Sequence, residues 1–210
     1  MPTSIPLIPG HYYHIYHRGN NREVIFREDR NYRYFLKRYA KYIEPIAFTY
    51  AYCLMPNHFH VAVRIKTAEE QHAWRLAHQT SEVSQTSEVF EALDPSWQFG
   101  RLFNSYTRAF NRAYHRSGSL FEGRFRRKEV IALPYLLNLI AYIHQNPIQH
   151  GFVETLGDWP WSSWHALQTD APTLLQRDEL RFWTGGFASA EAFAAANPID
   201  IGELIEEDWA

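Results

Sequence analysis

Residues 50–65 read YAYCLMPNHFHVAVRI, two apolar runs separated by a short polar segment. Both runs are rich in β-branched and aromatic side chains, which favour strands, and the Pro56-Asn57 pair between them favours a turn. The pattern predicts strands over 46–54 and 58–65, joined as a hairpin. Side chains alternate faces along a strand, so His58 and His60 point to one face and Phe59 to the other.

Two imidazoles on one face of a strand are suited to bind a divalent metal together. Such a pair is more often simply packed or exposed, so His58 and His60 alone leave both interpretations open. The metal hypothesis therefore depends on what else in the chain could share the site.

The flanking segments predict an α+β fold. Tyr32, Phe35, Leu36, Tyr39 and Ile43 recur at helical spacing, and proline residues are placed to open or end helices. The predicted elements are a strand over 11–17 with a turn at 18–21, a helix over 28–44, the hairpin, a helix over 98–116, a strand over 119–132, and a helix that Pro134 opens and Pro147 ends. This order predicts a ferredoxin-like antiparallel sheet, with helices packed mainly on one face.

Composition and organisation narrow the class of protein. The chain is 46% hydrophobic and 16% aromatic, which suffices for a sizeable core. Cys53 is the single cysteine, and no apolar stretch resembles a signal peptide or membrane span, so a cytoplasmic protein is expected. We expect a main domain over 1–165, with a mobile polar loop at about 78–96 that contains the repeat QTSEVSQTSEV, and an irregular or helical acidic extension over 166–210.

Charge is distributed unevenly along the chain although the net charge is only −2. Residues 151–210 contain 11 acidic and two basic residues, whereas residues 97–130 contain eight basic and two acidic ones. On the predicted helix 98–116, Arg101, Arg108, Arg112 and Arg116 lie opposite an aromatic side. A basic body with an acidic tail favours a nucleic-acid partner, although a solvated basic face would give the same pattern.

The predicted helix 134–146 carries the second candidate group. Asn138, Tyr142 and Asn146 are spaced by four and share one ridge, beside an apolar side on which His144 is expected to be structural. A tyrosine can attack phosphorus, but its pKa near 10 means that it needs help, which a divalent metal can give. Asn146 could add an amide oxygen to the metal, and such a ligand set favours Mg or Mn over Zn. Ordinary amphipathic packing would also explain this ridge.

The motifs together resemble those of a known family. They are HRGN at 17–20, AYCLMPNHFH at 51–60, GSLFEGR at 118–124, YIHQNP at 142–147, Gly151, and DWPWSS at 158–163. This ordered series resembles the REP-associated tyrosine transposases, which are relatives of the single-tyrosine transposases in the HUH endonuclease superfamily. The resemblance covers residues 11–165, but neither the polar repeat nor the tail beyond residue 170.

The resemblance implies a bacterial, nucleoid-associated enzyme that cuts single-stranded DNA with hairpin structure. By position, Tyr142 is the nucleophile that becomes joined to the 5′ phosphate, His58 and His60 are metal ligands, and Asn146 matches a third ligand. The family's substrates are hairpins of repetitive extragenic palindromes. Its members include monomers and homodimers, so both states remain open.

Contacts to DNA are expected along the basic segments. The candidate residues are Arg18 and Asn20 near the cleft, and Arg108, Arg112, Arg116, Arg124, Arg126, Arg127 and Lys128 on phosphates. Two alternatives remain: a non-catalytic nucleic-acid-binding module derived from a transposase, and a replication initiator or relaxase. The presence of both histidines and the tyrosine argues against the first, and the short chain argues against the second.

Overall fold

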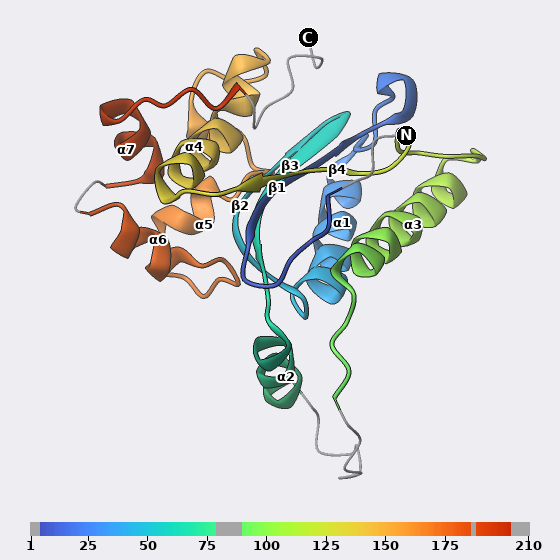
Figure 1. Ribbon diagram of the computed structural model, residues 1–210. Coiled ribbons are helices and arrows are strands. Elements are labelled where there is room, and N and C mark those ends of the chain that lie inside the picture. Colours follow the sequence, from blue (N-terminus) through green and yellow to red (C-terminus); the bar gives the residue numbers. More distant parts are fainter. Residues whose placement is uncertain (1–4, 79–89, 186–187, 203–210) are drawn as a thin grey trace.

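The computed structural model describes residues 5–78, 90–185 and 188–202, and its centre is a four-stranded antiparallel sheet in the order β2-β3-β1-β4 (Figure 1). The strands are β1 (Tyr12–Arg18), β2 (Ala47–Met55), β3 (His58–Ile65) and β4 (Arg126–Val130). Strands β2 and β3 form the predicted hairpin around Pro56 and Asn57. The ferredoxin-like prediction for the sheet is confirmed.

Helices cover both faces of the sheet, which corrects the expectation that they pack mainly on one. Helices α1 (Asp29–Ile43) and α3 (Pro95–Ala113) lie on one face, and α4 (Leu133–Gln149) lies on the other (Figure 1). The reason is that the central strands carry buried side chains on both faces. Phe59 joins the core under α1 and α3, whereas Ala62 joins the core under α4.

The connection after β3 contains a helix that the sequence analysis missed, α2 (Ala68–Ala77). Thr67 and Glu70 begin it with a reciprocal capping box, a signal that is present in the sequence. Residues 79–89, which hold the predicted mobile repeat, lie outside the described residues. The loop prediction is wrong at its far end, because the Asp94 side chain accepts the Trp97 amide at 2.7 Å and α3 already begins at Pro95.

Two predicted boundaries near the site are also wrong. The predicted strand 119–132 is reduced to β4, because Gly123 adopts a left-handed φ of +56° and Phe121 turns into the core. Helix α4 does not end at Pro147 but continues to Gln149. A proline removes only its own amide donor, and this close to the end of a helix the loss affects one hydrogen bond.

The C-terminal extension is helical and packs on the α4 side of the sheet (Figure 1). Its elements, with the turn that precedes it, are η2 (Leu156–Asp158), α5 (Trp164–Gln168), α6 (Arg177–Trp183) and α7 (Ala190–Ala196). Trp183 stacks on Tyr50 of β2 at 5.3 Å, and the Tyr50 hydroxyl donates to Glu179 at 2.7 Å. In the described part of the chain, every helix is too short or too polar to cross a bilayer.

Candidate catalytic and metal-binding site

Strand β3 and helix α4 bring the four candidate catalytic and metal-binding side chains together on one face of the sheet. His58 and His60 project from β3 toward α4, from which Tyr142 and Asn146 project back. The rings of His60 and Tyr142 are 5.7 Å apart, edge to face, and His58 Nε2 lies 3.1 Å from Asn146 Oδ1. All four residues belong to one chain, so a second copy is not needed to assemble them.

The surroundings of His58 fit a cation. Asn57 Oδ1 lies 2.7 Å from Nδ1, and Asn146 Oδ1 lies 3.1 Å from Nε2. Burial lowers the pKa of His58 to about 4, so the ring is neutral at pH 7 and has one proton for two oxygen acceptors. Either the Asn146 amide turns to donate, or a cation lies between its oxygen and Nε2.

The distance at this position is compatible with a cation as well as with a turned amide. Neighbouring ligands of an octahedral ion with bonds of about 2.1 Å lie about 3.0 Å apart, close to the separation of His58 Nε2 and Asn146 Oδ1. The described residues contain no cluster of three or more His, Cys, Asp or Glu that could hold a metal. A metal here would therefore be bound by two imidazoles and an amide, with its other positions occupied by water and substrate oxygens.

His14 is a neighbour of the site that the sequence analysis missed. Its Nε2 lies 2.9 Å from Nδ1 of His60, and both rings are buried. This contact engages Nδ1, so His60 would bind a metal through Nε2. Alternation along β1 already places His14 and Arg18 on one face, but only the pairing of β1 with β3 brings His14 beside His60.

Tyr142 is half-buried and carries its proton at neutral pH. Burial raises the pKa of its hydroxyl above 10, and the neighbouring Asn146 side chain offsets part of this effect. Its ring also meets the edge of His14 at 6.5 Å. The hydroxyl can act as a nucleophile only where negative charge on its oxygen is stabilised, and a metal held by His58 and His60 would supply that stabilisation.

A cavity of about 470 Å³ opens beside His58. It is lined by Arg18, Arg22, Val24, Pro56, Asn57, His58, His150 and Phe152. Arg18 forms an ion pair with Glu122, and His150 lies 5.3 Å from the His58 ring. Arg22 and His150 were not predicted, and Asn20, which was, does not line the cavity. The cavity leaves open space beside His58, lined in part by two arginines.

The predicted DNA-binding residues divide between the two faces of the sheet. In β4, Arg126 and Lys128 pair with Tyr16 and His14, so they lie on the face of the candidate site. Arg127 points to the opposite face, where its Nη1 donates to Ser96 at 2.7 Å.

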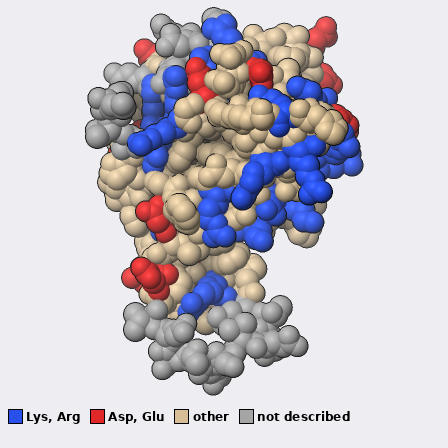
Figure 2. Space-filling view, turned by 90° about the vertical axis from the view of Figure 1, so that its right-hand side faces the viewer, with Lys and Arg blue, Asp and Glu red and all other residues tan. Residues whose placement is uncertain are grey.

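The remaining predicted arginines lie on α3 or in the segment between α3 and β4. Arg108 and Arg112 are exposed on α3, on the side where Figure 2 shows many Lys and Arg side chains. Arg116 follows the end of α3 and pairs with Glu23 at 2.6 Å, and Arg124 is exposed in the loop before β4. One basic group, Arg126 and Lys128, thus lies beside the candidate site, and a second group, Arg108 and Arg112, lies on α3 across the sheet from it.

His144 has the structural role that was predicted. It is buried, its Nε2 lies 2.7 Å from the Ser163 hydroxyl, and its Nδ1 pairs with Glu191. The Ser163 hydroxyl also accepts the Tyr52 amide of β2 at 2.9 Å. The DWPWSS segment therefore connects α4 to the sheet.

Comparison with known proteins supports the resemblance found in the motifs. No family model matches the chain. A putative REP-associated tyrosine transposase of Haemophilus influenzae is 29% identical over 119 residues, which are 56% of this chain and 58% of that protein, less than two thirds of its length. A solved structure of a REP-associated tyrosine transposase bound to a REP hairpin shares the fold, with a TM-score of 0.52, 16% identity, and coverage of 79% of this chain and 84% of the other. Both similar proteins bear the name of the family that the motifs resemble.

Proposed function

We propose that this protein cuts and rejoins single-stranded DNA with hairpin structure, using Tyr142 as the nucleophile and a divalent metal, Mg or Mn. The observation that carries the proposal is the position of Tyr142, whose ring contacts His60 while Asn146, one turn later, contacts His58. The hairpin substrate is supported by the similar structure, which holds a REP hairpin. Such a substrate would place the protein on nucleoid DNA in the bacterial cytoplasm.

His58, His60 and Asn146 would hold the metal. A bound divalent ion would stabilise the negative charge that develops around the scissile phosphate. Asn57 contacts Nδ1 of His58 and His14 contacts Nδ1 of His60, so each imidazole has a side chain that can hold its orientation. These contacts reduce the conformational entropy lost on binding, because the imidazoles are already positioned.

Tyr142 would carry out the covalent step. Its oxygen attacks the phosphorus, a new phosphorus–oxygen bond forms to Tyr142, and the bond to the 3′ oxygen breaks. The phenol proton is balanced by the proton gained at the released 3′ hydroxyl. The 5′-phosphotyrosine conserves the bond energy, so attack by another 3′ hydroxyl rejoins the strand and no ATP is required.

Transfer of a terminal label tests this proposal directly. In Mn²⁺, a hairpin strand labelled at its 3′ end should become covalently attached to the protein, whereas a 5′ label should leave on a fragment with a free 3′ hydroxyl. A chelator should prevent both events. Attachment of the 5′ label would contradict the proposed polarity. Binding of hairpins without any adduct in Mg²⁺ or Mn²⁺ would favour the non-catalytic binding module.

The two basic groups should contribute differently to cleavage. Changing Arg126 and Lys128 together to glutamine should slow cleavage of bound DNA by about tenfold, because these cations lie on the face of Tyr142. It should also make the plot of the logarithm of the binding constant against the logarithm of the salt concentration less steep. The slope should change by about 1.4, the value expected for two phosphate contacts to a single strand. Single-turnover cleavage at saturating protein and binding titrations at several salt concentrations measure both effects.

The matched control changes Arg108 and Arg112 on the far face. In that variant the salt dependence of binding is the one property that should change. The cleavage rate of bound DNA should stay the same. Equal losses of cleavage in both double variants would contradict the assignment of separate roles to the two groups.

A further inference from the structure

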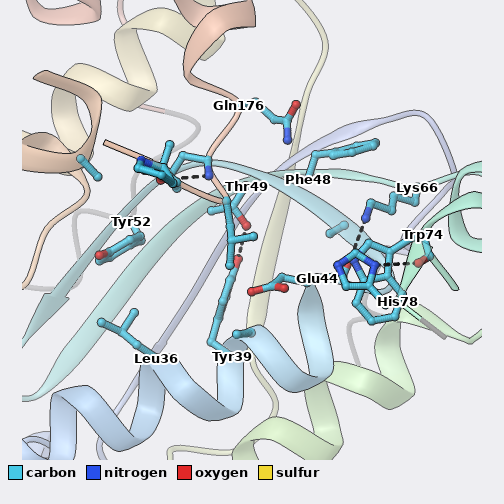
Figure 3. A pocket seen from close by; sticks show the side chains of 17 residues that line it. Leu36, Tyr39, Glu44, Phe48, Thr49, Tyr52, Lys66, Trp74, His78 and Gln176 are labelled. Carbon is cyan, nitrogen blue, oxygen red and sulfur yellow. Dashed lines mark hydrogen bonds between the residues drawn. The ribbon is translucent and has the colours of Figure 1, made fainter. Parts of the chain in front are cut away.

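A second cavity, of about 560 Å³, lies at the outer edge of β2, where the proposed cleavage step does not use it (Figure 3). Its walls come from the second half of α1, the first half of β2, Lys66 at the end of β3, α2 and residues 172–176. Tyr39, Phe48, Tyr52 and Trp74 supply aromatic surface, and His78 stacks on Trp74 at 4.3 Å. The size and the aromatic lining suit a planar organic ligand.

Lys66 is the cation of this cavity. The residue is only 4% exposed, and its Nζ donates to the Glu44 carbonyl at 2.6 Å and lies 4.5 Å from the Phe48 ring (Figure 3). An ammonium group has three donors, and this bond is the one it makes within the described residues. Two donors therefore remain for a ligand with acceptor atoms.

Glu44 is the anion of the same cavity. It follows the last turn of α1, and among the described residues its carboxylate has charged neighbours, His78 and Lys66, but no hydrogen-bond donor. Burial raises the pKa of this carboxyl, while nearby His78 and Lys66 lower it. A half-buried acceptor without a donor would be stabilised by a ligand that brings N–H groups.

We propose that this cavity binds a guanine base. Guanine offers acceptors at O6 and N7 to the Lys66 ammonium and an amine at N2 to the Glu44 carboxylate, while its ring stacks on the aromatic walls. Adenine would present an amine where the ammonium needs an acceptor, and it has no amine at position 2. The pairing of one cation, one anion and several rings thus selects guanine among the purines.

The base would come from the single strand that the proposed function requires, or from a free nucleotide. The inference rests on the proposed function only for the first source. Binding of deoxyguanosine monophosphate tests the cavity alone. Hairpins with a single-stranded tail, in which each guanine in turn is replaced by hypoxanthine, test whether the strand supplies the base.

Calorimetric titration with the monophosphates of deoxyguanosine, deoxyinosine and deoxyadenosine is the primary experiment. Deoxyinosine differs from deoxyguanosine only by the missing N2 amine, so wild type should bind it about tenfold more weakly, and the adenine nucleotide more weakly still. Glu44→Gln should reduce the difference between guanine and hypoxanthine to about threefold or less. Lys66→Met should weaken both by a similar factor of about tenfold.

Controls separate this inference from folding and from the cleavage proposal. Thermal melting reports whether each variant is folded, and Tyr142→Phe should bind the guanine nucleotide as wild type does. Equal binding of the three nucleotides, or no binding, would overturn the inference even if hairpins are cleaved. Guanine-selective binding by a protein that forms no adduct would sustain it and reject the cleavage proposal.

Discussion

Tyr142→Phe should abolish covalent capture of hairpin DNA and reduce strand cleavage by on the order of 10⁴-fold or more, as expected for loss of a nucleophile. The substitution removes one oxygen and keeps the ring that packs against His60 and His14. The fold and the affinity for hairpin DNA should therefore change little. Denaturing electrophoresis of labelled hairpin incubated with protein and Mn²⁺ measures the adduct, and a binding titration measures the affinity.

Two other tyrosines serve as controls that test whether the adduct forms on Tyr142 itself. Tyr135 is exposed on the same helix, so Tyr135→Phe is a matched control that should retain full adduct formation. Tyr16 also lies beside His60, with ring centroids 5.8 Å apart, and burial raises its pKa to about 12, so its hydroxyl is hard to ionise. An adduct that survives in Tyr142→Phe and disappears in Tyr16→Phe would transfer the nucleophilic role to Tyr16.

Local periodicity was enough to predict which candidate residues share a face of one strand and which share a ridge of one helix. A period of two placed His58 and His60 on one face and Phe59 on the other, and a spacing of four placed Tyr142 beside Asn146. Both relations hold in the structure because they depend only on the conformation of one strand and one helix. The series of motifs then indicated that the strand and the helix belong to one site.

What the sequence did not reveal depends on pairing between distant segments. His14 reaches His60 only through the register of β1 against β3, and Arg126 and Lys128 reach the face of the candidate site only through the pairing of β4 with β1. A shift of one residue in either register would reverse these faces, and no short hairpin turn joins β1 to β3 or to β4 to fix that register. The guanine cavity likewise combines Glu44, Lys66 and Trp74 from three different elements.

His60→Ala should weaken Mn²⁺ binding by more than about 100-fold, because a direct ligand is lost. Loss of an outer partner of a metal-bound histidine typically costs about 10–100-fold, and His14→Phe should fall in that range. His14→Gln should recover much of the affinity, since its side-chain oxygen can accept a proton on Nδ1 of His60, as Nε2 of a neutral His14 would at 2.9 Å. Electron paramagnetic resonance of Mn²⁺ in the absence of DNA measures affinity independently of cleavage.

A buried histidine outside the metal set provides the control for these variants. His144 is as buried as His60, but its two ring nitrogens engage Ser163 and Glu191, so His144→Gln should lower the free energy of unfolding and leave Mn²⁺ affinity unchanged. If His144→Gln weakened Mn²⁺ binding as much as His60→Ala, the losses would report a loosened fold rather than a missing ligand. Unaltered Mn²⁺ affinity in both His60→Ala and His58→Ala would contradict a metal site on this face of the sheet. Tyr142 would then need another source of charge stabilisation.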